Sequence, residues 1–295
     1  MYEKLTKCPL CHSGLFHNYM VVKDHAVSQE SFSICKCNNC SLLFTNPRPN
    51  EENIGKYYLS EDYISHEDKS SNLVNFMYKL VRKLTLKQKV KWLKENKESQ
   101  GRLLDFGCGT GYFLKAAEKH GWKAVGLEPN EKAAHMATKK HGLRILKNTS
   151  ELEEEKKFDV ITLFHVLEHV HELKNTLELL LTKLKKRGLL FIAVPNFNSY
   201  DSSVYKENWA ALDIPRHLYH FTYESMEVLA NQHHLKIKTT KPMIFDSYYV
   251  SILSDSYINN KKNLIKSVLN GYKSNRLGKK ENNNYSSILF ILKKV

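Results

Sequence analysis

Residues 165–170 read His-Val-Leu-Glu-His-Val, so two histidines and a glutamate recur at spacings of three and four residues. A group of this kind can hold a metal ion, move a proton, or join a strand to the helix that follows it. The segment directly follows "FDVITLF" (158–164), an apolar run typical of a strand covered on both faces. We therefore expect His165, Glu168 and His169 where a buried strand ends, and the residues alone leave the three roles open.

The cysteines form a second group that can do chemistry. Five of the six precede residue 41, and four of them make two Cys-x-x-Cys pairs separated by 25 residues: Cys8, Cys11, Cys37 and Cys40. Two such pairs match a structural zinc site, whose four thiolates leave no open position for catalysis. Cys35 could replace Cys37 as a ligand, and free buried thiols or a redox pair are the alternatives to zinc.

The stretch "LLDFGCGTGYFL" (103–114) runs from a short apolar strand into a helix pattern. Its glycines allow a sharp turn and a close approach of the backbone to a ligand. Tyr112 occupies the position where a dinucleotide motif needs a small residue, and no Lys-Ser or Lys-Thr pair follows, so that motif and a P-loop are both excluded. Glu128, at the end of the next strand, can accept hydrogen bonds from two ribose hydroxyls. The loop therefore suits a nucleoside without a pyrophosphate.

Strand and helix patterns alternate from residue 101 onward. Strands are expected at 102–106, 123–128, 143–146, 158–164, 188–195 and 286–294. Helices are expected from the glycine loop to about His120, at 130–140, at 171–186 and, N-capped by Thr222, at 222–233. The alternation predicts a parallel sheet with helices on both faces, to which the late strands add an antiparallel edge. The Asn/Lys-rich stretch 272–285 is expected to be a flexible loop.

Four motifs occur in order along the chain: "LLDFGCGTGYFL", "VGLEPN", "FDVITLFHVLEHV" and "GLLFIAVPN". Over about residues 101–245 they resemble the class I S-adenosylmethionine-dependent methyltransferases. The resemblance implies a Rossmann-like α/β fold with a seven-stranded sheet and helices on both faces. It also implies S-adenosylmethionine as the cofactor, with a binding site made of Asp105, Gly107, Gly109, Gly111, Glu128, Pro129, Asn148, Phe164 and His165.

The same resemblance assigns each part of the cofactor to a motif. Asp105 and the glycine loop would receive the methionine portion, and Glu128 would hold the ribose. Pro129 would flank the adenine, and Phe164 would lie on the other side of the cofactor. The family usually has a polar or acidic residue after the third strand for the adenine amino group, and Asn148 or Ser150 is the residue expected there.

Three parts of the chain are expected. Residues 1–45 form a zinc-ribbon-like module, 46–100 a linker with a long basic helix ending near Asn96, and 101–295 the S-adenosylmethionine-binding domain. The segments "FTNPRPNEENIGKYY" and "DIPRHLYHFT" resemble methyltransferases of bacterial surface-polysaccharide clusters. In the linker, three tyrosines would either cover the active site as a lid or pack onto the core: Tyr57, Tyr58 and Tyr63.

Residues 196–222 are expected to form a long loop over the methyl group that is transferred. Trp209 and Arg216 in this loop, together with Tyr58, are expected to contact the acceptor. Arg216 would pair with a phosphate or carboxylate of the acceptor, or else with Asp213.

Deprotonation of the acceptor needs a base with a pKa in the range of histidine. The candidates are His165, His169, His217 and His220, and the sequence does not rank them. The HVLEHV segment also resembles E-x-x-E-H, the metal-binding pattern of quinone and small-RNA O-methyltransferases, with His165 in place of the first acid. Two nitrogens and one carboxylate suit a magnesium ion less well than that pattern does.

The 295 residues carry a formal net charge of +14, with basic stretches at 79–97 and 257–295. Such stretches can meet nucleic acid, anionic lipid or a phosphorylated substrate, or can be solvated helix faces. The sequence has no apolar run of membrane-spanning length and no secretory pattern at its start, so a soluble cytoplasmic protein is expected.

The leading hypothesis is methyl transfer to a small-molecule acceptor, a sugar or another cell-envelope biosynthetic intermediate. An RNA methyltransferase is a less favoured alternative, suggested by the zinc module and the basic segments. A non-catalytic cofactor-binding module is the third. The acceptor, the methylated atom and the oligomeric state stay open.

Overall fold

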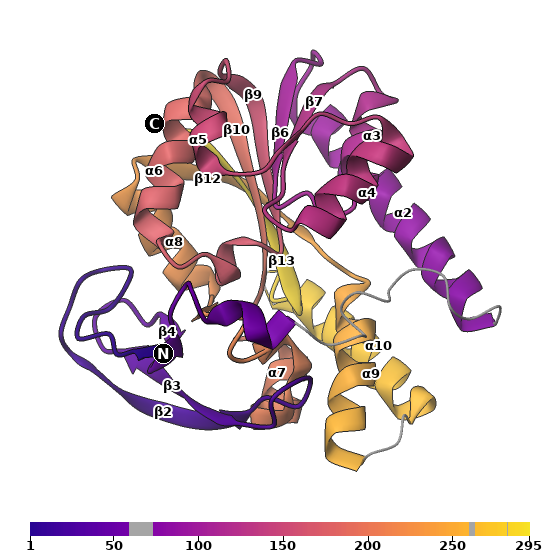
Figure 1. The fold of residues 1–295 in the computed structure, drawn as a ribbon. Helices are drawn as coiled ribbons and strands as arrows, with labels where there is room; N and C mark the ends of the chain where they lie inside the picture. Colours follow the sequence, from indigo (N-terminus) through magenta and orange to yellow (C-terminus); the bar gives the residue numbers. More distant parts are fainter. Residues whose placement is uncertain (59–72, 260–262, 282) are drawn as a thin grey trace.

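The computed structural model describes residues 1–58, 73–259, 263–281 and 283–295, with the backbone alone for 73–78. Within them lies a seven-stranded sheet in the order β12-β13-β10-β9-β6-β7-β8 (Figure 1). Its strands are β6 (Arg102–Phe106), β7 (Lys123–Leu127), β8 (Ile145–Leu146), β9 (Phe158–Phe164), β10 (Leu184–Pro195), β12 (Leu235–Pro242) and β13 (Ser287–Lys294). Neighbours from β10 to β8 are parallel, whereas β13 runs antiparallel to β10 and β12. The predicted mixed sheet is confirmed, although its antiparallel strand lies one position inside the edge.

Helices cover both faces of this sheet, as expected. Successive strand residues point to opposite faces, so Leu103 and Leu104 of β6 belong to two different cores. One core includes α2 (Leu73–Asn96), α3 (Tyr112–Glu118) and α4 (Glu131–His141), and the other includes α6 (Leu173–Lys183) and α8 (Tyr223–Gln232) (Figure 1). Thr222 caps α8 as predicted, because its side chain and that of Ser225 each accept a hydrogen bond from the other's backbone N–H. The helix expected at 171–186 is shorter, since 184–186 already belong to β10.

The sheet of the cysteine-rich N-terminal segment includes a strand from a distant part of the chain. Strands β2 (Phe16–Lys23), β3 (Ser31–Cys37) and β4 (Leu43–Thr45) form an antiparallel sheet, and β11 (Tyr219–His220) adds its fourth strand. At the start of the chain β1 (Tyr2–Glu3) pairs with β5 (Arg48–Pro49), which follows β4, and the 3₁₀ helix η1 (Ile54–Tyr58) comes next. The pairing of β4 with β11 joins the N-terminal segment to residues more than 170 positions away.

The segment 196–222 is compact, not the long irregular loop that the sequence predicts. It contains α7 (Tyr200–Tyr205), two 3₁₀ turns, η3 (Lys206–Asn208) and η4 (Ala210–Leu212), and β11. Its core is held by Asp201, which accepts hydrogen bonds from Trp209, Ser274 and Ser286. Buried apolar residues such as Leu212 and Ile214 pack this insertion against β2 and β3.

The prediction of a flexible loop at 272–285 is wrong for most of that stretch. Residues up to Lys280 belong to α10 (Leu264–Lys280), which packs against α9 (Asp246–Asn259). Asparagine and lysine suggested a loop, but small residues spaced along the helix allow close contact with α9, and this tertiary contact outweighs composition. Among the described helices, none combines the length and the apolarity that crossing a bilayer requires.

Candidate functional site

The glycine loop connects β6 to α3 at the carboxyl end of the parallel strands. Gly107 has a φ of 73°, and a Cβ there would lie 2.6 Å from Cγ2 of Val166, so any larger residue would clash. Gly109 also has a positive φ, 52°, but a Cβ there would meet no described atom within 4 Å. The backbone at Gly109 therefore borders open space that a ligand can enter.

Two desolvated carboxyl groups lie on the neighbouring strand ends. Asp105 accepts a 2.7 Å hydrogen bond from Thr162, and burial raises its pKa to about 6. Glu128 accepts hydrogen bonds from the backbone N–H groups of Gly109 (2.8 Å) and Asn130 (2.9 Å), and burial raises its pKa as well. A bound cation would restore the charge of such carboxyl groups.

Lys89 of α2 is a member of this site that sequence reasoning missed. Its Nζ lies 3.8 Å from the centre of the Phe164 ring, and its charge interacts with those of Asp105 and Asp246. Burial lowers the pKa of Lys89. In the sequence it is one of eight cations between 79 and 97, and nothing in their spacing distinguishes it.

His165 ends β9 in the left-handed backbone region, with a φ of 58°. Its Nε2 lies 3.0 Å from Oδ2 of Asp246, the first residue of α9, and its Nδ1 lies 3.7 Å from Oε1 of Glu168. Burial by itself would lower the pKa of His165, but the two carboxylates outweigh it and raise the pKa to about 9. At neutral pH the ring is therefore a cation held between two acids.

Glu168 is the centre of the predicted HVLEHV group and is fully buried in η2 (Leu167–His169). In the part of the chain that the structure describes, neither carboxylate oxygen has a hydrogen-bond partner. Side-chain atoms of Glu168, His169 and His217 lie within 4.8 Å of one another. Burial would raise the pKa of Glu168, but His165, whose Nδ1 lies 3.7 Å from Oε1, and the neighbouring His217 hold it below its usual range. A metal ion at these residues stays a hypothesis.

His169 joins the β9 turn to the insertion, and not to the following helix. Its Nδ1 lies 3.0 Å from the backbone oxygen of Arg216 and 3.0 Å from the hydroxyl of Tyr58. Because a carbonyl only accepts, we assign the proton to Nδ1, which leaves Nε2 as the acceptor nitrogen. Burial and the charge of His217 lower the pKa of His169 to about 4, so the ring is neutral at pH 7. Helix α6 has no side-chain cap at its N-cap residue, Glu172.

The other two candidate bases are more enclosed. Nδ1 of His217 lies 2.9 Å from the backbone oxygen of Ala211. His220 lies in β11, 3.4 Å from Oγ1 of Thr45, and burial lowers its pKa to about 3. The exposed fraction of His220 is 4%, which leaves it little access to a substrate.

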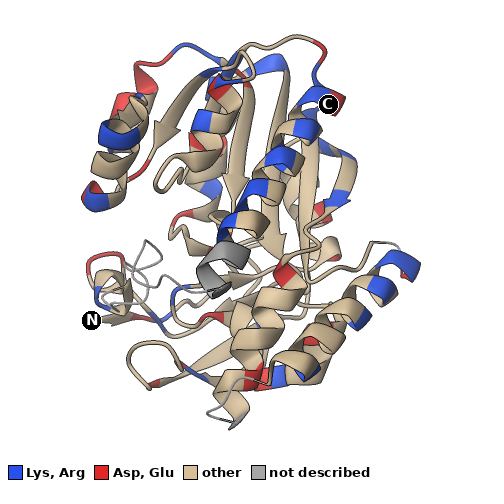
Figure 2. Ribbon diagram, turned by 90° about the vertical axis from the view of Figure 1, so that its right-hand side faces the viewer, with Lys and Arg blue, Asp and Glu red and all other residues tan. Residues whose placement is uncertain are grey.

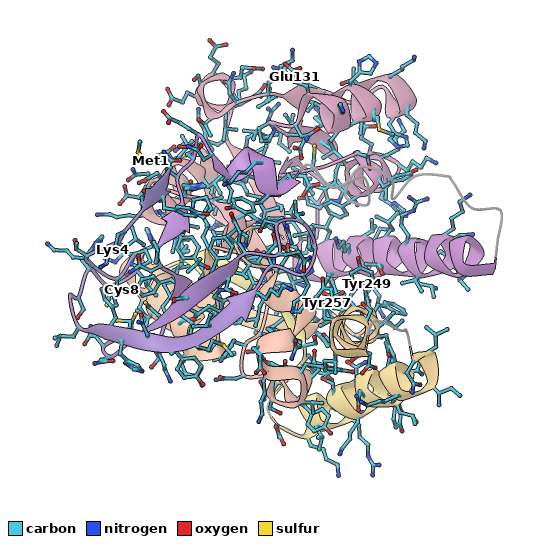
Figure 3. The ribbon with its side chains drawn as sticks, turned by 60° about the horizontal axis from the view of Figure 1, so that its bottom comes forward. Met1, Lys4, Cys8, Glu131, Tyr249 and Tyr257 are labelled. Carbon is cyan, nitrogen blue, oxygen red and sulfur yellow. The ribbon has the colours of Figure 1, made fainter. Side chains whose placement is uncertain are left out.

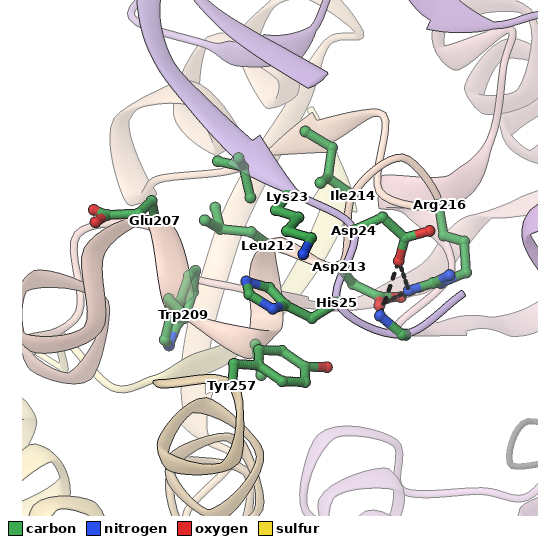
Figure 4. Close-up of a pocket in the computed structure, with 13 residues that line it drawn as sticks. Lys23, Asp24, His25, Glu207, Trp209, Leu212, Asp213, Ile214, Arg216 and Tyr257 are labelled. Atoms are coloured by element: carbon green, nitrogen blue, oxygen red, sulfur yellow. Dashed lines mark hydrogen bonds and ion pairs between the residues drawn. The ribbon is translucent and has the colours of Figure 1, made fainter. Parts of the chain in front are cut away.

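Arg216 pairs with Asp213, the alternative that the sequence left open. Its Nε lies 3.0 Å and its Nη2 2.5 Å from the Asp213 carboxylate, and Asp24 of the N-terminal segment lies 3.5 Å from Nη2 (Figure 4). The remaining guanidinium nitrogen, Nη1, donates a hydrogen bond to the backbone oxygen of Tyr57. The cavity beside this group is about 10 Å³, hardly more than one water molecule needs. Arg216 thus ties three segments together.

Other predicted site residues have structural partners of their own. Trp209, expected at the acceptor, is buried and its Nε1 donates a 2.8 Å hydrogen bond to Asp201. Asn148, expected at the adenine, is the N-cap of α5 (Thr149–Glu153). Pro129 follows Glu128 directly, at the carboxyl end of β7. The predicted lid residue Tyr63 lies outside the described residues.

The sequence pattern of the methyltransferase domain family matches residues 77–240, more than half of the chain. The chain belongs to this family. This methyltransferase uses S-adenosylmethionine, in agreement with its four ordered motifs.

The methyltransferase is similar to several curated proteins over part of its length. It is 34% identical over 101 residues to the ubiquinone biosynthesis O-methyltransferase of Pelagibacter ubique (strain HTCC1062), and 31% identical over 107 residues to that of Rickettsia prowazekii (strain Madrid E). These matches cover 32% and 34% of this chain. The chain spans 42% of the length of each relative.

Solved structures share the fold of the methyltransferase. Magnesium protoporphyrin IX methyltransferase from Synechocystis PCC 6803 with bound SAH has a TM-score of 0.55 at 14% identity, covering 83% of this chain and all of its own. The plantazolicin methyltransferase BpumL in complex with SAH has a TM-score of 0.51 at 17% identity, covering 81% and 93%. At this identity the likeness concerns the fold alone.

The four predicted zinc ligands of the methyltransferase lie together. The Sγ atoms of Cys8 and Cys40 are 3.6 Å apart, those of Cys11 and Cys37 are 3.5 Å apart, and all four lie within 4.8 Å of one another. Four sulfurs at about 2.3 Å from a zinc ion would be about 3.8 Å apart, so the spacing fits the ion. Cys35 lies outside the group, with its Sγ 3.3 Å from Oδ1 of Asn18, which favours Cys37 as the fourth ligand.

Proposed function

We propose that the chain transfers the methyl group of S-adenosylmethionine to a hydroxyl of a small acceptor, a sugar or related cell-envelope intermediate. The observation that carries this proposal is the neutral His169 beside the buried carboxylate of Glu168, next to the strand end where the cofactor motif lies. A hydroxyl needs a base when it attacks the methyl group, and His169 has an acceptor nitrogen available at neutral pH.

The cofactor side uses the carboxyl groups and glycines described above. Asp105 would receive the cationic methionine portion, which would compensate its buried charge, and Glu128 would accept from the ribose hydroxyls. The open space at Gly109 would let the cofactor lie against the backbone of the glycine loop. Lys89 would contact the carboxylate of the cofactor. Pro129, Asn148 and Phe164 keep the roles that the family resemblance implies for them.

The acceptor side divides its tasks among the histidines. His169 would take the acceptor proton through Nε2, because its Nδ1 is held by the backbone of Arg216. His165 would stay protonated, and would position Asp246 and Glu168 around the reacting groups. Methyl transfer from a sulfonium otherwise needs alignment and exclusion of water, which Tyr58 and the insertion would supply.

The acceptor class is supported from two directions. The linker and insertion segments resemble methyltransferases of surface-polysaccharide clusters, which favours a sugar. The relatives are named for O-methylation in ubiquinone biosynthesis, which makes a hydroxylated ring the competing small acceptor. Both classes offer a hydroxyl oxygen, so the proposed chemistry is the same for either.

The deciding experiment measures methyl transfer from isotopically labelled S-adenosylmethionine to nucleotide sugars, to hydroxylated quinone precursors and to RNA. We expect label in a small molecule, a loss of at least about 100-fold in turnover for His169→Gln, and little change for the exposed His135→Gln on α4. Unchanged turnover in His169→Gln would refute the assignment of the base. Unchanged cofactor affinity in Asp105→Ala would refute the cofactor site.

We also propose a structural zinc ion at Cys8, Cys11, Cys37 and Cys40. Four thiolates complete a tetrahedral site, so the ion would hold the fold and carry out no chemistry. We expect one zinc per chain by elemental analysis, and loss of that zinc in Cys40→Ser but not in Cys35→Ser. A metal-free wild type that keeps its full thermal stability would contradict the site.

RNA methylation remains a second candidate because of one surface feature. A cleft of about 330 Å³ between α2 and α3 is lined by three apolar residues, Leu86, Val90 and Ala116, and by Lys79, Arg82, Lys83, Lys87, Tyr112 and His120. Basic side chains with an aromatic ring suit a single-stranded nucleic acid. RNA retention that falls steeply with salt, together with label in RNA, would favour this candidate over the small acceptor.

A further inference from the structure

Helix α10 carries its large apolar side chains on the outside. Its outward residues are 48% to 78% exposed and follow the spacing of one helix face: Leu264, Ile265, Val268, Leu269 and Tyr272. Its buried face consists of small residues: Ser267, Gly271, Ser274 and Gly278. A helix that simply covers a protein core has the opposite arrangement, with large apolar residues inside and polar ones outside.

The orientation of α10 is fixed by its contacts with α9. A Cβ on Gly271 would lie 2.7 Å from Cδ1 of Tyr248 and 2.9 Å from its Cα, so the two backbones touch at this point. Oγ of Ser267 donates a 2.5 Å hydrogen bond to Asp255. The helix therefore cannot rotate to bury its apolar face, and this face is a permanent part of the surface. Figure 3 shows α10 beside α9, which is marked by Tyr249 and Tyr257, and α10 also contacts α7, where Ser274 donates a hydrogen bond to Asp201.

Basic residues extend the apolar face toward the C-terminal end of α10. Arg276, Lys279 and Lys280 follow Tyr272 by four, seven and eight residues, which places them on the same side of the helix. Lys266 and Lys273 flank that side, and α10 itself contains no acidic residue. Figure 2 shows these cations along the helix at the lower right. The surface thus combines an aliphatic stripe with five cations, of which Lys266 also pairs with Asp255 of α9 at 3.6 Å.

We propose that this surface, formed by the outward residues of Leu264–Lys280, docks on an anionic lipid bilayer. The apolar stripe would enter the interfacial region, and the cations would lie against the headgroups. A second copy of the chain would bring five cations against five, which opposes association. Four of the five cations are lysines, which protein interfaces disfavour but whose long stems suit a headgroup layer.

The position of α10 relates the docking surface to the acceptor side. Helix α9, against which α10 packs, begins at Asp246, 3.0 Å from His165. Docking would therefore hold the methyltransferase where amphiphilic acceptors lie. The proposal stands apart from the identity of the acceptor, because it rests on the surface of α10 alone.

The test uses the full chain in flotation with vesicles of phosphatidylcholine alone or mixed with phosphatidylglycerol. We expect flotation with the anionic vesicles and more than about tenfold weaker partitioning into the neutral ones. Ile265→Ser/Leu269→Ser and Lys279→Gln/Lys280→Gln should each weaken partitioning by more than about tenfold. The control, Leu15→Ser/Val21→Ser, changes two apolar residues of the N-terminal segment that are equally exposed, and should float like the wild type.

Three results would overturn the proposal. The first is a wild-type chain that does not bind anionic vesicles. The second is that both α10 variants float with these vesicles as well as the wild type does. The third is a wild-type dimer in light scattering that Ile265→Ser/Leu269→Ser converts to monomer, with no vesicle binding, since this would assign the face to a second copy. Cofactor affinity, measured in parallel, should be the same in all four proteins and so shows that each is folded.

Discussion

The two sides of the site are built in different ways. Most of the cofactor side comes from one short stretch, from Asp105 to Glu128, where a strand, a glycine loop and the end of the next strand follow one another, and Lys89 and Phe164 join it from other elements. The acceptor side joins Tyr58, the turn at 165–169, the insertion around Arg216, and Asp246 of α9. A site built from one stretch is visible in the sequence, whereas a site assembled from four segments depends on the complete fold.

The two sides also differ in how the charges of their acidic residues are compensated. Asp105 and Glu128 have raised pKa values because burial exceeds the compensation from their neighbours, so Lys89 does not fully balance these acids until a ligand arrives. On the acceptor side each acid has a basic neighbour within the protein, as Asp213 has Arg216 and Asp246 has His165. Changes on the acceptor side should therefore affect stability first, and changes on the cofactor side should affect ligand binding first.

The largest effect is expected from Arg216→Met. The substitution leaves Asp24 and Asp213 without their cation, and breaking a buried ion pair costs about 3–5 kcal/mol of unfolding free energy. Urea unfolding measures this loss, and the exposed Arg187→Met should change stability by less than about 0.5 kcal/mol. A folded Arg216→Met protein should keep its cofactor affinity, and weakened binding in that protein would contradict the separation of the two sides.

Glu128→Gln should give the reverse result. A hydrogen bond to a charged group contributes about 1.5–3 kcal/mol and one to a neutral group about 0.5–1.5 kcal/mol, so cofactor affinity should fall about 10-fold in calorimetry. Glu131→Gln in the first turn of α4 is the matched control, because that side chain is exposed. Equal cofactor affinities in the two variants would show that Glu128 does not contact the cofactor.

Gly109→Ala tests whether the open space in the glycine loop is a binding site. Gly109 and Gly142 both have positive φ, 52° and 67°, and a Cβ at either meets no described atom within 4 Å. Alanine should cost each variant about 1–2 kcal/mol of stability for the same backbone reason. Only Gly109→Ala should also lose cofactor affinity, and equal affinity in both variants would show that no ligand approaches Gly109.

The last test concerns pH. Because the pKa of His165 rises from 6.5 to about 9 on folding, its contribution to stability is complete below pH 6.5 and is lost as the pH rises through 9. His165→Asn should flatten this decline in urea unfolding measured between pH 6 and pH 10, and the exposed His135→Asn should not. An identical pH profile in His165→Asn and the wild type would show that His165 makes no charged contact with Asp246.

The places where sequence reasoning succeeded and failed follow the same division. The central strands, the Thr222 cap and the cysteine quartet were predicted, since each depends on neighbours in the sequence or on a repeated spacing. Lys89 was missed because it resembles every other lysine of α2. The loop expected at 272–285 is mostly helix, because contacts of Gly271 and Ser267 with α9 outweigh a composition typical of loops.

The sequence by itself determined the fold class and the family, because alternating strand and helix patterns and a glycine loop are local properties of the chain. Only the tertiary structure decided which residues of the acceptor side meet. It brought β4 to β11, Arg216 to Asp24, and His169 to Tyr58 and Arg216. The physical reason is that these contacts join segments up to 192 positions apart, as Arg216 and Asp24 are, and become favourable only when both cores are packed.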